Sequence, residues 1–264
     1  MVKNLSIIIP SFNEAENINE LYKRIIKTLD EINLNDYEII FVENGSSDNS
    51  LEILRSINGL NNKVKIISLS RNFGYQNAIL AGLDYSKKDH ACILDGDLQD
   101  PPELIKNFVL KAKEGFDVVY GIRKKRQATF FKKVSYKLFY FFYHKLSEIS
   151  VPKEVGEFSL INRKVINHLK NLREKNLFLR GLRSWVGFNQ IGIEYERLER
   201  HKGNAKFSFS DSFIFGLDGI ISFTMIPLRV VLILGLILSS LSLIYFLFIL
   251  ITKLLVIFGL ELPL

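Results

Sequence analysis

The sequence contains one cysteine, Cys92, among 264 residues. A single cysteine cannot form an internal disulfide, and the chain has no Cys/His cluster with the spacing of a zinc site. The sequence therefore argues against a disulfide-stapled secreted domain and against a zinc module. We also expect no secretory signal peptide, because Met1 to Asn4 lead directly into a short strand-like run. We expect the part of the chain before its long apolar run to face the cytoplasm.

Acidic residues are fewer than basic ones. Asp and Glu total 28 against 35 Lys and Arg, which gives a net charge of +7 and a pI near 9.3. This excess suits phosphates, lipid headgroups or nucleic acid without choosing among them. Hydrophobic residues make up 48% of the chain, which excludes a disordered or collagen-like protein and suffices for one sizeable α/β domain or two small ones.

Charge is absent from residues 230–251. These 22 residues lie between Arg229 and Lys253, and their length matches the roughly 30 Å of hydrocarbon in a bilayer. Core helices rarely stay apolar on every face for so long, so we interpret residues 229–253 as a transmembrane helix rather than a buried one. Residues 254–264 are apolar but too short to span, which predicts a truncated second membrane segment or an interfacial tail.

Acidic residues are also absent from residues 118–147, which hold eight Lys or Arg and nine aromatic residues. Residues 129–146 are expected to form a basic amphipathic helix at the membrane interface, with lysines near anionic lipid. Basic residues interleaved with aromatic ones would also suit single-stranded nucleic acid, but the nearby membrane segment favours lipid and no nucleic acid. Residues 207–228 are interpreted as a second amphipathic helix, next to the membrane.

The first 121 residues alternate short β-branched runs with helix-length amphipathic stretches. This alternation predicts an α/β fold with a parallel sheet and crossover helices, whose ligands bind at the carboxyl ends of the strands. The expected strands are Leu5–Ile9, Glu38–Val42, Val64–Leu69, Ala91–Leu94 and Val118–Tyr120.

Polar residues follow four of these strands, at 10–14, 43–48, 70–74 and 95–100. Turns and helix caps explain part of this pattern. Asp95 and Asp97 are different, because two carboxylates on alternate residues at a strand end repel each other unless a cation or a hydrogen-bond network compensates. Mg²⁺ or Mn²⁺ bridging these carboxylates to a diphosphate would do so.

Seven motifs in order carry a resemblance over nearly the whole chain. They read IIIPSFNEAENI, ENGSSDNS, SRNFGYQNAILAGLD, LDGDLQDPPELI, YGIRKKR, EVGEFSLINRKVI and RHKGNAKFSFSD, followed by PLR and the membrane segment. The chain resembles the polyprenyl-phosphate glycosyltransferases of glycosyltransferase family 2, which include dolichyl-phosphate mannose synthases and bacterial undecaprenyl-phosphate sugar transferases. The resemblance implies an A-type, Rossmann-like nucleotide-sugar-binding domain over residues 1–206. It also implies inverting transfer of one sugar from a UDP- or GDP-sugar to a polyprenyl phosphate at the cytoplasmic face of the membrane.

The resemblance implies roles for particular residues. Glu157 and Asp97 would be catalytic, and Asp95 and Asp97 would hold Mg²⁺ or Mn²⁺. The nucleotide-sugar would contact Pro10, Asn13, Glu14, Glu43, Asn72, Asp95, Gly96 and Gln99. The acceptor and the diphosphate would contact Arg123, Arg126, Arg200, Lys206 and Ser208. The implied partners are the nucleotide-sugar, the lipid phosphate and the bilayer, and a homo-oligomer is left open.

Some positions depart from the family pattern. Family members usually show two aspartates where this chain has Glu43 and Asn44, aspartates at Glu154 and Glu157, and commonly an arginine at Ser159. These departures keep two alternatives open: a catalytically impaired nucleotide-sugar-binding protein and a non-enzymatic membrane interaction protein. A processive polysaccharide synthase is disfavoured, because the chain lacks a Gln-x-x-Arg-Trp motif. The motifs do not fix the sugar, the nucleotide or the exact lipid.

Overall fold

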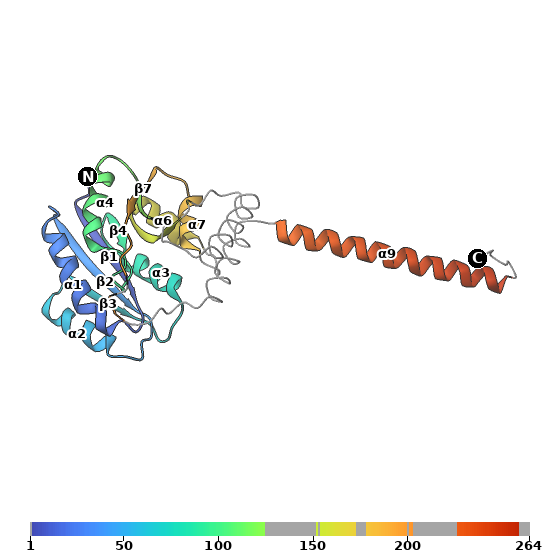
Figure 1. The fold of residues 1–264 in the computed structure, drawn as a ribbon, viewed down its shortest axis with the longest axis horizontal. Coiled ribbons are helices and arrows are strands. Elements are labelled where there is room, and N and C mark those ends of the chain that lie inside the picture. The colour runs from blue at the N-terminus through green and yellow to red at the C-terminus, as the bar shows by residue number, and fades with distance from the viewer. Residues whose placement is uncertain are drawn as a thin grey trace.

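The structure is a computed structural model, and it describes residues 2–124, 152, 154–172, 178–199, 201–202 and 226–258. The expected interfacial helix at residues 129–146 and nearly all of the expected helix at 207–228 lie outside the described residues. Figure 1 shows a sheet domain with helices on both sides and one long helix that extends away from it.

The domain is built on a seven-stranded sheet with the order β3-β2-β1-β4-β6-β5-β7. The first four strands are mutually parallel, as the sequence predicts, whereas β6 runs antiparallel to both β4 and β5. The sequence pattern did not predict β6 or β7. The strands are β1 (Asn4–Ser11), β2 (Asp36–Glu43), β3 (Val64–Ser68), β4 (His90–Ile93), β5 (Val118–Arg123), β6 (Val155–Asn162) and β7 (Gln190–Tyr195).

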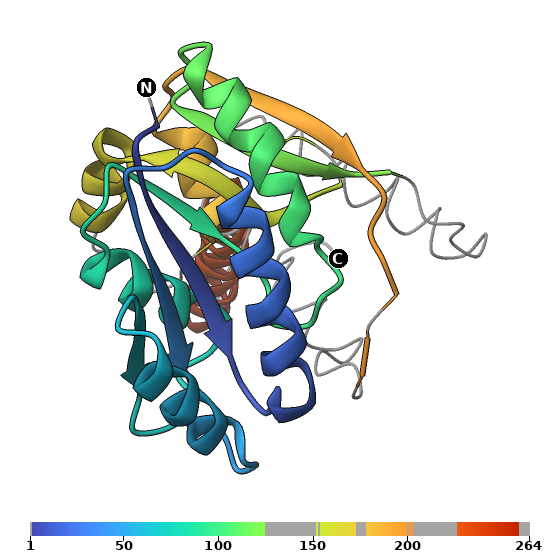
Figure 2. The same cartoon turned by 90° about the vertical axis from the view of Figure 1, so that its left-hand side faces the viewer.

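Helices cover both faces of the sheet, which gives two hydrophobic cores. One core joins the sheet to α1, α2 and α4, and the other joins it to α3, α6 and α7. In Figure 2, α1 and α4 lie over the near face. The helices are α1 (Ala15–Asp30), α2 (Ser50–Leu60), α3 (Tyr75–Tyr85), the short η1 (Pro102–Leu104), α4 (Ile105–Lys113), α6 (Arg163–Asn171), α7 (Leu179–Trp185) and α9 (Ile226–Ile257).

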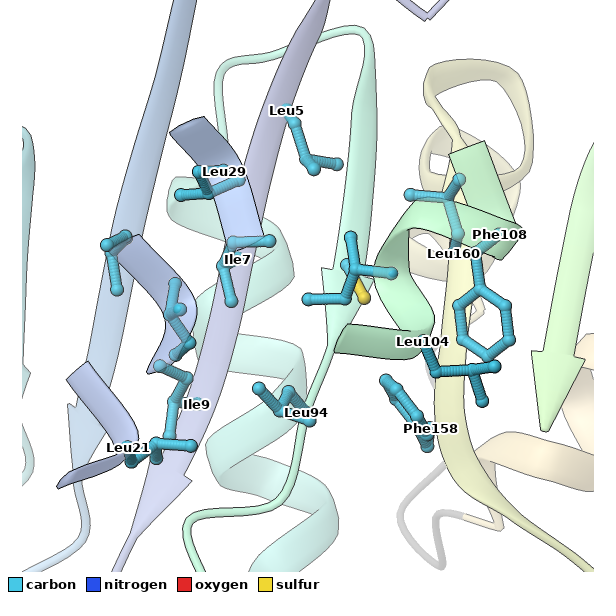
Figure 3. Packing of buried hydrophobic residues seen from close by; sticks show 14 of the residues in the cluster. Leu5, Ile7, Ile9, Leu21, Leu29, Leu94, Leu104, Phe108, Phe158 and Leu160 are labelled. Carbon is cyan, nitrogen blue, oxygen red and sulfur yellow. The ribbon is translucent and has the colours of Figure 1, made fainter. Parts of the chain in front are cut away.

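Alternation along the strands decides which side chains enter which core. In β6, Phe158 and Leu160 pack with Phe108 in the core beneath α1 and α4 (Figure 3), while Ile161 enters the core beneath α3, α6 and α7. Successive side chains of a strand point to opposite faces. Ser159 and Glu157, two and four residues before Ile161, therefore point toward the α3 and α7 side.

The helix α9 is the part of the described chain that could cross a membrane. Its segment Leu228–Ile257 has 30 residues, a mean hydropathy of 2.6 and no burial against the rest of the protein. At 1.5 Å per residue, 30 residues span about 45 Å, more than the roughly 30 Å of a bilayer core. The expected transmembrane helix is thus a continuous helix that begins slightly earlier and ends slightly later than residues 229–253.

Candidate active site

Two carboxylates from distant parts of the sequence meet at one edge of the sheet. The antiparallel register of β4 and β6 pairs Ile93 with Ser159. Asp95 comes two residues after Ile93, and Glu157 comes two residues before Ser159, so the end of β4 is level with the beginning of β6. Both acids were assigned to the site by resemblance, and the reversed direction of β6 explains why they are neighbours.

Asp95 is the most crowded of these acids. Its Oδ1 accepts a hydrogen bond from the Tyr75 hydroxyl, and its Oδ2 lies 3.9 Å from Arg123 Nη2 and 3.7 Å from Arg197 Nη2. Burial raises the pKa of Asp95 to about 7, and the Asp100 and Asp97 carboxylates add to the shift, while the hydrogen bond from Tyr75 and the charge of Arg123 oppose it. Asp95 is therefore a partly protonated acid near neutral pH in the absence of an added cation.

Asp97 lies in the tight loop that follows β4. Its Oδ1 accepts a hydrogen bond from the Gln99 backbone N–H at 3.1 Å. A Cβ on Gly96 would lie 3.3 Å from the carbonyl oxygen of Pro10 and 3.5 Å from Glu14 Cγ, so the loop packs closely on the end of β1. The four residues assigned to the nucleotide-sugar or the metal at this point, Pro10, Glu14, Gly96 and Asp97, are thus brought together.

Asp100 organises the cationic side of the site. It is fully buried and accepts hydrogen bonds from the Tyr195 hydroxyl, from Arg197 Nε at 3.2 Å and from Arg123 Nη2 at 3.4 Å. Burial lowers the pKa of Arg123, but the Asp100 and Asp95 carboxylates outweigh it and the net shift is upward. Arg123 was expected here. Asp100, Tyr195 and Arg197 were not, because each is fixed by a partner far along the chain.

A Cβ on Gly156 would lie 2.5 Å from Arg123 Nη2. The missing side chain thus leaves room for the guanidinium beside β6.

Glu157 is held from the start of α3. It is 6% exposed, and its Oε1 accepts a hydrogen bond from Gln76 Nε2 at 3.2 Å. The other end of the same amide, Gln76 Oε1, accepts from the backbone N–H of Leu179, the first residue of α7, at 3.2 Å. Gln76 therefore connects the assigned catalytic acid to α7. It lies inside one of the motifs but was not assigned a role.

The residues expected around the nucleoside lie in loops at the ends of β1 and β2 that are hydrogen-bonded to each other. Asn13 Oδ1 accepts from the Ser47 N–H at 2.8 Å, and the Asn13 N–H donates to Ser46 Oγ at 2.9 Å. Glu43 accepts from the Ser46 N–H at 2.5 Å and from Ser68 Oγ at 3.2 Å. Both oxygens of Glu43 thus bond within the protein, so this carboxylate shapes the loop.

Asn44, one of the departures from the family pattern, fixes the loop that contains Asn72. Its Nδ2 donates to Asn72 Oδ1 at 3.1 Å and to the Gly74 carbonyl at 3.3 Å, and its Oδ1 accepts from the Phe73 N–H at 2.9 Å. An aspartate could accept at this position but could not donate. The amide is therefore matched to this loop.

A scan against protein-family models matches residues 6–170 to the model described as Glycosyl transferase family 2. The chain belongs to this family.

Relatives extend the match over most of the chain. The uncharacterized glycosyltransferase YkcC of Bacillus subtilis is 43% identical over 94% of this chain and 77% of its own length. The putative glycosyltransferase CsbB of the same organism is 38% identical over 91% and 73%. The bactoprenol glucosyl transferase of Shigella phage SfV is 36% identical over 91% and 78%. The protein is thus a family 2 glycosyltransferase.

Solved structures share its fold at low identity. The mannosyltransferase PcManGT from Pyrobaculum calidifontis, in complex with GDP-Man and Mn²⁺, aligns with a TM-score of 0.53 and 17% identity over 72% of this chain and 54% of its own. Mannosyl-3-phosphoglycerate synthase from Rubrobacter xylanophilus aligns with a TM-score of 0.53 and 16% identity over 82% and 71%. The fold is that of the A-type glycosyltransferases.

A metal held by Asp95 and Asp97 would share its coordination shell with the substrate. Among the described residues, no three His, Cys, Asp or Glu side chains are grouped as ligands. Mg²⁺ commonly uses one or two carboxylates together with substrate phosphates. Asp95 and Asp97 suit such a site, because burial raises the pKa of Asp95 and the Asp100 and Asp97 carboxylates raise it further, and a bound cation would offset both effects.

Four of the residues assigned to the acceptor and the diphosphate lie outside the described residues: Arg126, Arg200, Lys206 and Ser208. Of this group, the structure places Arg123. Gln99 also lies at the site. Its side-chain Nε2 donates to the Leu198 backbone carbonyl at 3.4 Å, and its backbone carbonyl accepts from the Leu198 N–H at 3.0 Å. These bonds attach the segment after β7 to the Asp97 loop.

Proposed function

We propose that this glycosyltransferase transfers one sugar, with inversion, from a UDP- or GDP-sugar to a polyprenyl phosphate at the cytoplasmic face of the membrane. The observation that carries the proposal is the meeting of Asp95 and Glu157 at one edge of the sheet, with arginines beside the first acid. The apolar helix α9 and the relative named bactoprenol glucosyl transferase support a lipid phosphate as the acceptor.

The donor's diphosphate would lie near Asp95, Asp97 and Arg123. Loss of a nucleoside diphosphate leaves negative charge on the leaving group, which cationic side chains stabilise. A bound Mg²⁺ or Mn²⁺, held by Asp95 and Asp97, would supply Lewis-acid stabilisation of that charge. Arg123 and Arg197 are already aligned by Asp100, so little reorganisation is needed when the donor binds.

Glu157 would act on the acceptor side of the anomeric carbon. A phosphate monoester has a second pKa of about 6, so a lipid phosphate is largely ionised at neutral pH and needs little general-base help. The carboxylate would instead orient the acceptor and stabilise positive charge that develops on the sugar. The hydrogen bond from Gln76 holds the Glu157 side chain in the rotamer that this role needs.

The membrane helix would bring the acceptor to this site. A polyprenyl chain remains in the bilayer, while its phosphate enters a domain attached to the same membrane through α9. We place the domain on the cytoplasmic side because nucleotide-sugars would reach it there. The glucosyl transferase relatives make a glucosyl donor the first to test.

Sugar transfer by the purified, detergent-solubilised chain tests the proposal. The assay combines undecaprenyl phosphate with a panel of labelled UDP- and GDP-sugars, with Mg²⁺ or Mn²⁺ and with or without chelator. We expect a metal-dependent lipid product from one donor. Nucleotide binding without product from any donor would favour an impaired nucleotide-sugar-binding protein. Neither product nor binding would favour a non-enzymatic membrane protein, and either result overturns the proposal.

A further inference from the structure

Arg183 is a buried arginine that takes no part in the hydrogen bonds and ion pairs around Asp95, Asp100 and Glu157. It lies on α7 and is 4% exposed. Its Nε and Nη1 have no hydrogen-bond partner in the described part of the chain, and no described carboxylate oxygen lies within 4.0 Å of it. Its guanidinium carbon lies 5.0 Å from the centre of the Tyr120 ring. Buried polar groups are nearly always paired, so this one calls for a partner.

The charge balance around Arg183 favours an anion. Burial lowers the pKa of Arg183 and the nearby Arg180 lowers it further, while the charge of Glu157 raises it. A buried charge without close compensation is costly, and a bound anion would compensate it.

Arg183 lies on the same side of the sheet as Glu157. The β5–β6 register pairs Tyr120 with Ser159, whose side chain points to the same face as Glu157. Tyr120, whose ring lies under Arg183, is therefore the cross-strand neighbour of Ser159. Ser159 is two positions from Glu157, the assigned catalytic acid. Gln76 independently ties Glu157 to the first residue of α7. Helix α7 thus places the guanidinium beside Glu157.

The arginines of the donor side approach from the other face. Arg123 Nε donates to the Tyr195 hydroxyl at 3.3 Å, and Tyr195 belongs to the core beneath α1 and α4. Arg183 belongs to the α3 and α7 side, beneath which the second core lies. The two sets of cations therefore flank the edge of the sheet where Asp95 and Glu157 meet.

We propose that Arg183 binds the phosphate of the acceptor beside Glu157. This inference rests on the proposed function and adds the residue that holds the attacking group. The planar guanidinium offers two adjacent N–H donors to two phosphate oxygens, a geometry that fits a phosphate monoester. The phosphate would pair with a guanidinium that has Glu157 nearby but no described carboxylate oxygen within 4.0 Å. It would also be placed next to the carboxylate that orients it.

Trp185 offers a reporter for this test. It is the single tryptophan of the chain, lies two residues after Arg183 and is 58% exposed. The full chain in detergent, with EDTA present, is titrated with undecaprenyl phosphate and separately with undecaprenol while Trp185 fluorescence is followed. UDP and GDP binding is measured on the same preparations by calorimetry. The difference between the two lipids isolates the contribution of the phosphate.

We expect Arg183→Gln to weaken undecaprenyl phosphate binding about tenfold or more, the loss typical of a charge-assisted hydrogen bond. Undecaprenol, UDP and GDP should bind as they do to the wild type. Arg24→Gln is the matched control, because Arg24 pairs with Glu103 on the surface. If Arg183→Gln does not fold, Arg183→Lys replaces it, with roughly threefold to tenfold weaker binding expected from the lost fork geometry.

Three results would overturn the inference. The variants could bind undecaprenyl phosphate as tightly as the wild type. They could instead lose UDP or GDP binding, which would assign Arg183 to the donor. The wild type could bind undecaprenyl phosphate no better than undecaprenol, which would remove the acceptor itself. A wild type that binds the lipid phosphate through Arg183 but transfers no sugar would overturn the proposed function and leave this site standing.

Discussion

Tyr75 and Gln76 are consecutive residues at the start of α3, and each hydrogen-bonds a different acid of the site. Tyr75 donates to Asp95 and Gln76 donates to Glu157. Burial and the Asp95 and Glu157 carboxylates raise the pKa of Tyr75 well above its usual value, so its hydroxyl stays a donor. One turn of helix thus sets the relative position of two carboxylates that come from different strands.

Replacing Gln76 should disturb the position of Glu157 without disturbing the binding of the nucleotide-sugar. Gln76→Leu removes the hydrogen-bond donor to Glu157 and leaves the Leu179 N–H without its acceptor. Gln76→Glu also removes the donor and puts a second carboxylate beside that of Glu157. We expect kcat to fall roughly 10- to 100-fold in Gln76→Leu and further in Gln76→Glu, because small misplacements of reacting groups are costly. The KM for the nucleotide-sugar should change less than about threefold.

Steady-state kinetics of sugar transfer by the detergent-solubilised chain separate the effect on kcat from the effect on the KM for the nucleotide-sugar. Asn77→Leu, on the next residue of α3 and exposed, is the control and should leave kcat unchanged. A rise in KM for the donor with an unchanged kcat would contradict the positioning role of Gln76.

Glu157→Gln should abolish most of the transfer while the protein still binds nucleotide. The change keeps the shape of the side chain but removes the negative charge that we assign to the sugar and acceptor. We expect a loss of about 10²- to 10⁴-fold in kcat, with UDP or GDP affinity within about threefold of the wild type. Single-turnover transfer and calorimetry measure the two quantities. Wild-type-like turnover would remove Glu157 from the catalytic residues.

Asn44→Asp introduces the residue that the family resemblance leads us to expect, yet it should destabilise this protein. The carboxylate cannot donate to Asn72 Oδ1 or to the Gly74 carbonyl, and it would place a negative charge against both oxygens. We expect a loss of roughly 1–3 kcal/mol in the free energy of unfolding. Thermal melting by circular dichroism tests this, with the exposed Asn33→Asp as control. Equal melting temperatures for Asn44→Asp and the wild type would show that the amide is not needed.

The sequence predicts the half of the site that comes from local order along the chain. Polar residues directly after β1, β2 and β4 indicate the active edge, since parallel strands end on the same side of a sheet. The Asp95 and Asp97 pair indicates the phosphate region by its own repulsion. The apolar run at residues 230–251 likewise predicts α9 from composition alone.

The other half depends on partners distant in sequence. Asp100 resembles a helix-start residue, and only the return of β7 brings Tyr195 and Arg197 to it. The antiparallel direction of β6, which makes Glu157 a neighbour of Asp95, has no local signal in the sequence. Resemblance to a family supplied Glu157, but it gave no reason for Gln76 or Arg183.

Gly156→Ala should weaken diphosphate binding by displacing Arg123. The added Cβ would lie 2.5 Å from Arg123 Nη2 and 2.9 Å from its guanidinium carbon, so the side chain must move away from Asp100. We expect UDP or GDP, whichever the wild type prefers, to bind about tenfold more weakly, with little change for the corresponding monophosphate. Gly59→Ala, where the new Cβ meets nothing within 4 Å, is the control. Equal losses for diphosphate and monophosphate would refute the link to Arg123.

Asp95 makes the stability of the metal-free protein fall as pH rises. Its pKa of about 7 lies above the ordinary value of 3.8, so between these values the folded protein binds more protons than the unfolded chain. The stabilisation from the protonated acid is therefore fully present below about pH 4 and is lost as pH rises toward and through about 7. Asp95→Asn removes this dependence while keeping an acceptor for the Tyr75 hydroxyl. At pH 8, with EDTA, it should melt at least about 2 °C above the wild type.

The same variant tests the metal. At pH 8, Mn²⁺ should raise the melting temperature of the wild type, because the cation stabilises the ionised carboxylates of the folded state only. At pH 5 the rise should be smaller, since Asp95 is then mostly protonated and a proton must be displaced before the ion binds. Asp95→Asn should show little rise at either pH. An equal Mn²⁺ effect in the variant would mean that the ion binds elsewhere, and Asp95 would then serve only to align Arg123 and Arg197.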